Sequence, residues 1–337
     1  MSDQILSIAE ITDRVIAAFT ASRVAPDIAA SVARALIRAE CDGKFGHGLS
    51  RVGSYAAQAR SGKVDGFAAF SITHPRPGAM SVDVAGGFAY PALEAVNRDL
   101  PAFARTHGVA MAGLYHSHHC GVAGHHVEAA ADQGMVALLF ANTPSAMAPW
   151  GGRTALLGTN PIAFAAPVAN APAIVIDLAT SSVARGGIMK AAANDQPIPE
   201  GWALDADGNP TTDAKAALKG TMTPMAEAKG AALALMIEVL AAAVTGAGFA
   251  YEATSFLDAE GAPPNAGQLM IMIDAGAFSS AASARIAEIA ERISDDGARL
   301  PGAGRILKRQ QVERDGLTIS QQILDTIDNL AATPILK

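Results

Sequence analysis

The order of the predicted elements is the feature that most constrains the fold of this chain. Amphipathic helical periodicity occupies both ends, whereas the middle alternates helices with short apolar runs typical of buried strands. Helices are predicted at residues 6–19, 26–40, 50–60, 91–106, 122–134, 227–246 and around 286–293, and about the last 40 residues form a helical tail. Strands are predicted at 80–84, 108–114, 136–141, 162–166, 174–178 and 269–273, and 190–225 is predicted to be irregular. This mixture indicates an α/β protein with a central mixed sheet and a helical domain built from both termini.

The amino-acid composition limits which class of protein this chain can belong to. Half of the 337 residues are hydrophobic and 17% are charged, which is typical of a globular chain. The net charge of −7, without a basic stripe, argues against a nucleic-acid partner. The most apolar stretch, 231–250, contains Glu238 and ends in glycines, so we expect a buried helix and no membrane span. The first residues lack the pattern of a signal peptide, and we expect a cytoplasmic protein.

Histidines are concentrated in one short segment. Five of the eight histidines lie between residues 116 and 126, in HSHHCGVAGHH. Such a cluster indicates either a metal site, as in a metal-dependent hydrolase, or the wall of a reaction pocket. Adjacent histidines on a helix point about 100° apart, and no His-Glu-x-x-His pair is present. The spacing therefore favours the pocket wall, and no metal is expected.

The same segment could contact a nucleotide, although the common fingerprints are missing. No GxGxxG follows a predicted strand, and no P-loop motif occurs. Instead, the strand at 108–114 leads into His119–Gly124, which contains two glycines and precedes a helix. Free amides at a helix start can hold a phosphate, but the pattern also fits a plain strand-to-helix turn.

A second candidate motif lies near residue 47. His47 stands between two glycines, and Arg51 follows four residues later. If helix resumes there, the two side chains face the same way. Histidine can donate a proton to a carbonyl oxygen, and arginine can clamp a carboxylate through two hydrogen bonds. The pair fits a 2-oxo acid substrate; a turn histidine beside a solvated arginine is the alternative.

Three further sites carry polar groups beside apolar segments. The loop 150–161 offers Thr159 and Asn160 next to a strand, and Asp177–Ser181 ends a buried strand where α/β proteins often bind ligands. Lys229 precedes the apolar helix, where it either reaches water or meets an anion.

Taken together, several blocks resemble the type 2 malate/L-lactate dehydrogenase family from near Ala39 to about Arg309. The blocks are CDGKFGHGLSRVGSY, HSHHCGVAGHH, NTPSAMAPWGGRTALLGTNPIAFAAP, DLATSSVARG and PEGWALDADGNPTTD. The resemblance implies a non-Rossmann fold and NADH- or NADPH-dependent reduction at C2 of a 2-oxo acid, or of a cyclic 2-imino acid such as piperideine- or pyrroline-2-carboxylate. It also implies a homodimer and a small anionic substrate.

The resemblance assigns roles by position. His47 is implied as the proton donor, Arg51 as the clamp on the substrate carboxylate, and Thr159 as a substrate contact. The cofactor contacts, with NADP slightly favoured over NAD, are implied at His119, Cys120, Gly121, Val122, Ala123, Asp177, Leu178, Ala179, Lys229 and Arg305.

The chain departs from the family at two positions near the implied proton donor. Gly46 stands where a serine is common, and Gly187 where the imino-acid reductases carry an aspartate. These departures favour a 2-oxo acid over a cyclic imine as the substrate. They also leave open the hypothesis that the chain is a family member that binds nucleotide without turning over a substrate. The expected division is a helical domain of 1–65 and 280–337, a connecting segment 66–115, and a cofactor-binding sheet domain 116–279.

Overall fold

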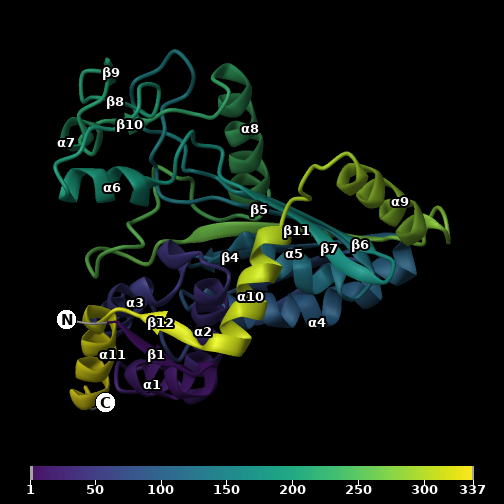
Figure 1. The fold of residues 1–337 in the computed structure, drawn as a ribbon, viewed down its shortest axis with the longest axis horizontal. Helices are drawn as coiled ribbons and strands as arrows, with labels where there is room; N and C mark the ends of the chain where they lie inside the picture. The colour runs from purple at the N-terminus through teal and green to yellow at the C-terminus, as the bar shows by residue number, and fades with distance from the viewer. Residues whose placement is uncertain (1–2, 336–337) are drawn as a thin grey trace.

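A seven-stranded mixed sheet forms the centre of the protein (Figure 1). The computed structural model describes residues 3–335. The strand order is β2-β3-β4-β11-β5-β6-β7, and the only parallel pair among these strands is β3 with β4. The strands are β2 (Ser71–Arg76), β3 (Ala79–Asp83), β4 (Val109–Ser117), β5 (Met135–Ala141), β6 (Ile162–Val168), β7 (Ala171–Leu178) and β11 (Ala266–Asp274).

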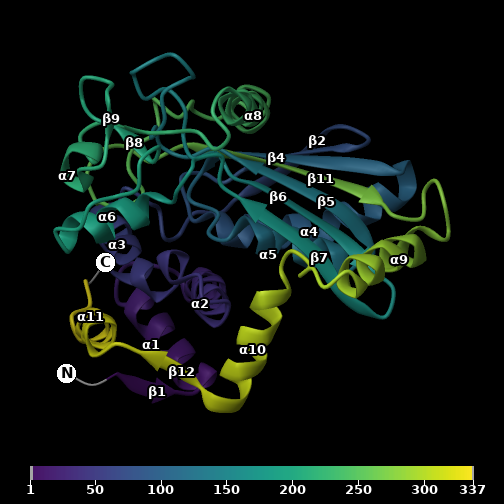
Figure 2. The same ribbon diagram turned by 45° about the horizontal axis from the view of Figure 1, so that its top comes forward.

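Helices cover the two faces of this sheet unequally. Helices α4 (Ala89–His107) and α5 (Ala123–Ala131) pack on one face and enclose the largest hydrophobic core. The other face carries α8 (Ala228–Glu238), which continues into the π-helical turn η3 (Val239–Ala243). Figure 2 shows α8 on the opposite side of the sheet from α4 and α5. The second face is therefore less completely covered.

A helical layer from both chain ends has a core of its own. Helix α1 begins with a capping box in which Ser7 and Glu10 satisfy each other's backbone amides. Helix α2 begins at Pro26 and buries an apolar stripe that includes Val32 and Leu36. The layer comprises α1 (Ile8–Thr20), α2 (Pro26–Cys41), α3 (Val52–Ser61), α11 (Gln321–Ala332) and the paired strands β1 (Gln4–Leu6) and β12 (Leu317–Ile319).

A smaller third core lies beyond the end of the sheet, where the chain between β7 and α8 folds back on the loop after β5. It contains α6 (Arg185–Ala193), α7 (Ala214–Ala217) and the short strands β8 (Ala203–Leu204), β9 (Pro210–Thr211) and β10 (Thr221–Met222). The segment 190–225 is thus more ordered than its composition predicts, because short pieces of structure pair with each other.

The last helices connect the sheet to the helical layer. Helix α9 (Ala282–Asp295) packs against β6, and α10 (Ala303–Asp315) runs from the sheet toward α2 (Figures 1 and 2). The predicted mixed sheet with a helical layer from both termini is confirmed. Between residues 3 and 335, no helix is both long and apolar enough to cross a membrane.

Candidate active site

His47 lies in a tight turn between α2 and α3. Two 3-10 turns, η1 (Phe45–His47) and η2 (Leu49–Arg51), occupy this segment, so the α-helix begins at Val52, two residues later than predicted. The Arg51 Nε donates to the Gly46 carbonyl oxygen at 2.6 Å. A Cβ at Gly48 would lie 2.1 Å from the Glu40 Oε2, the oxygen that accepts the Leu49 amide. A side chain at 48 would therefore push the Glu40 carboxylate away from the Leu49 amide, and the turn holds Arg51 against the backbone beside His47.

The segment after β4 brings a second imidazole to His47. The rings of His47 and His119 stack with centroids 5.3 Å apart and planes inclined by 27°. The Tyr55 hydroxyl from α3 lies 2.5 Å from the His119 Nδ1. When this hydroxyl donates, the proton of the neutral His119 ring resides on Nε2. The structure thus joins two predicted motifs, His47 with Arg51 and His119, which are 72 positions apart at their histidines.

Burial keeps these rings uncharged. Desolvation, with repulsion from Arg51 and Lys44, lowers the pKa of His47 to about 4. Desolvation also lowers the pKa of His119 well below its usual value, with Arg51 the next contribution. Burial raises the pKa of Tyr55 to about 12, so its hydroxyl remains a donor at neutral pH. At pH 7 the pair of imidazoles is neutral and lies beside the positive charge of Arg51.

The other four histidines of the cluster have separate partners. His116 pairs with Asp83 at 3.0 Å, and His125 with Asp42 at 2.9 Å. The His118 Nε2 contacts the Gln58 Oε1 at 3.0 Å, and the His126 Nε2 donates to the Cys120 carbonyl oxygen at 2.8 Å. Over the described chain, no three His, Cys, Asp or Glu side chains gather as metal ligands. The arrangement gives the metal-dependent hydrolase hypothesis no support.

The start of α5 collects a second group of the predicted residues. The Asp177 Oδ2 accepts the Gly124 amide at 3.0 Å. A Cβ on Gly124 would lie 2.9 Å from both this oxygen and the Arg305 Nη1. The buried Arg305 Nη1 has no hydrogen-bond partner within residues 3–335. A helix N-terminus flanked by an unsatisfied guanidinium fits an anionic group such as a cofactor phosphate.

Thr159 is linked to the end of β7. Its carbonyl oxygen accepts the Thr180 amide at 2.9 Å and the Thr180 hydroxyl at 3.0 Å. Its own amide donates to the Thr143 hydroxyl at 2.9 Å. Thr159 therefore lies beside the segment that contains Asp177, Leu178 and Ala179, and Leu178 is 48% exposed there.

Lys229 follows a segment of chain that contacts the residues after β7. It is exposed at the start of α8. The preceding chain runs along the end of β7, because the Met225 amide donates to the Thr180 carbonyl oxygen at 2.8 Å. The structure gives Lys229 no side-chain partner among the described residues.

The residues 119–123 connect the two groups. His119 reaches His47, whereas Ala123 begins α5 beside Asp177 and Arg305. Gly121 has a φ of 69°, and a Cβ there would lie 2.7 Å from the Tyr90 hydroxyl oxygen. Glycine at 121 is thus required both by the backbone conformation and by the close approach of Tyr90.

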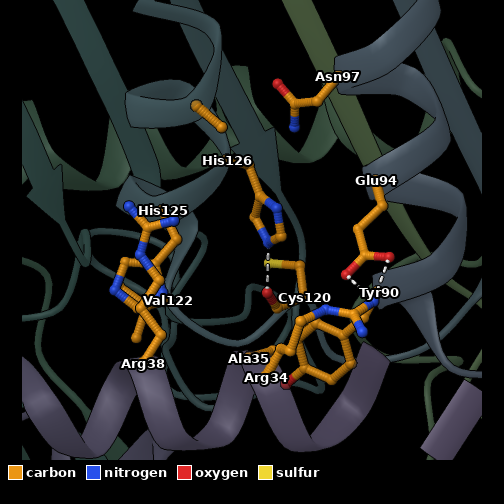
Figure 3. A pocket seen from close by; sticks show the side chains of 11 residues that line it. Arg34, Ala35, Arg38, Tyr90, Glu94, Asn97, Cys120, Val122, His125 and His126 are labelled. Atoms are coloured by element: carbon orange, nitrogen blue, oxygen red, sulfur yellow. Dashed lines mark hydrogen bonds and ion pairs between the residues drawn. The ribbon is translucent and has the colours of Figure 1, made fainter. Parts of the chain in front are cut away.

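A pocket of about 350 Å³ opens behind this connection, between α2, α4 and α5 (Figure 3). Val122 and His126 line it, and they lie on the face of α5 opposite to Gly124. Its arginines are already paired, Arg34 with Glu94 at 2.9 Å and Arg38 with Glu128 at 3.0 Å. The predicted cofactor contacts at Asp177 and Arg305 therefore lie on the other side of α5.

Tyr55 and Phe256 are site residues that sequence reasoning missed. The Phe256 ring lies 5.1 Å from the His119 ring, and its carbonyl oxygen accepts the Gln58 Nε2 at 2.9 Å. Tyr55 belongs to the block CDGKFGHGLSRVGSY and lies one helical turn after Arg51. That spacing could have indicated Tyr55, whereas nothing in the local sequence marks Phe256.

Comparison with known proteins places the chain in a family. The profile of the malate/L-lactate dehydrogenase family matches residues 6–328. The chain belongs to this family. The resemblance seen in the sequence blocks is confirmed, and this malate/L-lactate dehydrogenase family member is an oxidoreductase.

Individual relatives of this family member cover nearly the whole chain. It is 44% identical over 335 residues to a (2R)-3-sulfolactate dehydrogenase (NADP(+)) from Chromohalobacter salexigens, covering 98% of this chain and 99% of the relative. It is 41% identical over 299 residues to a Delta(1)-pyrroline-2-carboxylate/Delta(1)-piperideine-2-carboxylate reductase from Pseudomonas putida, covering 87% and 86%. The solved delta1-piperideine-2-carboxylate reductase from Pseudomonas syringae superposes with a TM-score of 0.92 at 36% identity, covering 97% and 99%.

Proposed function

We propose that this enzyme reduces an acyclic 2-oxo acid to the 2-hydroxy acid with NADPH, and catalyses the reverse oxidation. The observation that carries the proposal is the stack of His47 on His119 beside Arg51. It provides a proton donor and a carboxylate clamp beside the segment that leads to the start of α5. The sulfolactate relative, whose name specifies NADP(+), supports both the substrate class and the cofactor.

Arg51 is suited to bind the substrate carboxylate. Its Nε is used by the Gly46 carbonyl oxygen, and no acceptor in residues 3–335 takes its two Nη groups. Two parallel N–H donors match the two oxygens of a carboxylate. Thr159 is proposed to contribute its hydroxyl to the same substrate. Binding of the carboxylate at Arg51 holds C2 of the substrate near His47.

His47 supplies the proton. As hydride reaches C2, negative charge develops on the C2 oxygen, and the protonated His47 ring gives its proton to this oxygen and becomes neutral. The stacked His119 and the aromatic Phe256 exclude water from this side of the turn. In the oxidation, the neutral His47 ring accepts the proton from the hydroxyl.

The cofactor site is assigned to residues on both sides of the connection 119–123. Bound NADPH would supply the hydride, and Arg305 beside the start of α5, whose Nη1 has no partner within residues 3–335, suits its phosphates. The proposed contacts are His119, Cys120, Gly121, Val122, Ala123, Asp177, Leu178, Ala179, Lys229 and Arg305.

A cyclic 2-imino acid is the second candidate substrate, because seven relatives, 33–41% identical, are named as reductases of such compounds. Gly46 and Gly187 argue against it. A Cβ at Gly46 would meet nothing within 4 Å, so the space beside His47 is open, and Gly187 lies beside Val183 and Trp202. His47 therefore lacks side-chain partners from both positions.

We also propose that the enzyme is a cytoplasmic homodimer in which the helical layer supplies His47 and Arg51 and the sheet supplies the cofactor contacts. Both cysteines are free and buried, which suits a reducing compartment. We propose a helical domain of 1–65 and 280–337, a cofactor-binding part of 116–279, and a connecting segment 66–115 that contributes β2, β3 and most of β4 to the central sheet.

Two measurements test the function. A panel of pyruvate, oxaloacetate, 3-sulfopyruvate and the two cyclic imines, each with NADH and NADPH, is followed at the absorbance of the reduced cofactor. We expect turnover with an oxo acid and NADPH; preference for an imine would favour the second candidate. Cofactor binding without turnover on any of them would indicate a catalytically silent member.

The variant His47→Ala then tests the proton donor. We expect kcat to fall about 10²- to 10⁴-fold, the usual contribution of general acid catalysis, with the NADPH Kd unchanged. The Kd is measured by quenching of cofactor fluorescence. Retained turnover in this variant would exclude His47 as the donor.

A further inference from the structure

Glu238 is a buried carboxylate at the end of α8, in the most apolar stretch of the chain. It is 4% exposed. Its Oε1 accepts the Asn142 Nδ2 at 3.2 Å and the Ala250 amide at 2.6 Å, and its Oε2 accepts the Asn160 Nδ2 at 2.7 Å. Burial of a carboxylate is costly unless donors surround it, and here three N–H groups do so. Such an arrangement fixes the positions of the donors as well as of the carboxylate.

The hydrogen bond with Asn160 connects Glu238 to Thr159, the proposed substrate contact. Asn160 follows Thr159, is fully buried and has a φ of 29°, a backbone conformation unusual for a residue other than glycine. Its Nδ2 also donates to the Ala234 carbonyl oxygen at 3.0 Å, and its Oδ1 faces the Thr143 amide at 3.4 Å. Thr143 in turn accepts the Thr159 amide. The Asn160 side chain therefore connects the strained turn to α8 and to the chain after β5.

The contact with Asn142 anchors Glu238 to the sheet. The Asn142 Oδ1 accepts the Gly267 amide at 2.8 Å, at the start of β11. A Cβ at Gly267 would lie 1.8 Å from the Ala241 carbonyl oxygen, so η3 presses directly on this strand. A π-helical turn immediately after Glu238 is a departure from α-helix that often marks functional sites.

We propose that Glu238 is a positioning residue for the substrate site: its Oε2 holds the Asn160 side chain, which sets the place of Thr159. This proposal rests on the proposed function. A purely structural role would affect stability alone, whereas a positioning role makes kcat/KM for the acid depend on the one contact between Glu238 and Asn160.

The two oxygens of Glu238 allow that contact to be altered separately. In Glu238→Gln, the amide oxygen remains opposite the two donors at Asn142 and Ala250, and the amide nitrogen replaces Oε2. Its N–H groups then oppose those of Asn160. The second change Asn160→Asp restores a donor–acceptor pair with reversed polarity, and the Asp oxygens still face the Thr143 amide. Only the Ala234 carbonyl oxygen loses its donor.

We expect Glu238→Gln to lower kcat/KM for the 2-oxo acid about tenfold or more, since opposed donors in a buried site lose at least one hydrogen bond. The NADPH Kd should stay within about threefold, because Thr180 still holds the Thr159 carbonyl oxygen. Asn160→Asp alone places two carboxylates together and should be at least as severe. The double variant should recover most of the lost kcat/KM.

Glu252→Gln is the matched control. This exposed carboxylate accepts the Phe249 amide at 2.8 Å in the neighbouring turn and does not touch Asn160. Its kcat/KM should equal that of the wild type. Additive losses in the double variant, or an unchanged kcat/KM in Glu238→Gln, would overturn the positioning role.

Activity of the wild-type enzyme distinguishes a failure of the proposed function from a failure of this inference. If the wild-type enzyme turns over no 2-oxo acid, the proposed function fails, and the backbone amide NMR signals of Thr159 and Thr180 then decide the positioning role. These signals should shift in Glu238→Gln and return in the double variant. Signals that stay in place in Glu238→Gln would contradict the inference.

Discussion

At the scale of single residues, the surroundings of His47 favour the neutral imidazole. Its pKa is lowered to about 4 by burial first and by the positive charges of Arg51 and Lys44 next. In the free enzyme the protonated donor is thus a minor species at neutral pH. In the proposed mechanism, a substrate carboxylate bound to Arg51 would offset that charge and raise the His47 pKa when the donor is needed.

This low pKa predicts opposite pH dependences for the two directions. Reduction starts from protonated His47, whose fraction in the free enzyme falls about tenfold per pH unit above its pKa. We therefore expect kcat/KM for reduction to fall steadily between about pH 5 and 8, while kcat/KM for oxidation, which needs the neutral ring, does not fall. Initial rates in both directions across this range measure the effect. A flat reductive profile would contradict His47 as the titrating donor.

The histidine cluster shows what could be predicted from the sequence at this scale. The pattern indicated a pocket wall, and His119 is the histidine of the cluster that stacks on His47. Its neighbour His118 points elsewhere, to Gln58. The two partners Tyr55 and Gln58 lie 64 and 60 positions earlier in the chain, and such pairings depend on the tertiary fold. Local spacing therefore identified the segment and could not identify each partner.

At the scale of elements, buried charges connect three helices near the site. The Arg309 guanidinium on α10 pairs with Asp42 at the end of α2 and with Glu128 on α5, the latter at 2.8 Å. Asp42 precedes the His47 turn, and Arg305 lies one helical turn before Arg309. Hydrogen bonds from His125 and Arg309 hold the pKa of Asp42 well below its usual range despite burial, and the pKa of Glu128 is also lowered.

Removal of Arg309 should leave two largely buried carboxylates with one partner each, His125 for Asp42 and Arg38 for Glu128. We expect Arg309→Gln to reduce the free energy of unfolding by about 3 kcal/mol at neutral pH. Carboxylates with lowered pKa values stabilise the fold above their unfolded pKa of about 4, and this contribution is lost as pH falls through the folded values. The difference between wild type and variant should therefore shrink in acid. Urea unfolding at several pH values measures it, and a difference that grows in acid would contradict the assignment.

The elements also differ in how far the sequence predicted them. Long helices such as α2 and α4 were predicted closely because their apolar periodicity is local. The strands β1 and β12 were missed, since Gln4–Leu6 forms a strand only by pairing with Leu317–Ile319. The insertion of β11 between β4 and β5 is likewise a tertiary pairing that no local pattern contains.

At the scale of the whole molecule, one face of the sheet stays apolar and incompletely covered. On α8 and η3, Leu235 is 56% exposed and Val239 is 46% exposed. Met111 on β4 is 40% exposed and points to the side of the sheet on which η3 packs, opposite to the buried Ala110 and Ala112. Exposed apolar side chains that gather on one face often mark a protein interface. We infer that a second copy of the chain covers this face, in agreement with the proposed homodimer.

A charge on this face should therefore separate the subunits. The double variant Leu235→Glu with Val239→Glu places two carboxylates where a dimer would bury them without partners, which costs several kcal/mol of association free energy. We expect the wild type to have the mass of a dimer by light scattering after size-exclusion chromatography, and the variant to have the mass of a folded monomer by the same measurement and circular dichroism. Phe278→Glu is the matched control, since this side chain is 97% exposed in the turn between β11 and α9, and it should leave the dimer intact. A wild-type enzyme that is monomeric at micromolar concentration, or a double variant that stays dimeric, would show that this face is not the interface.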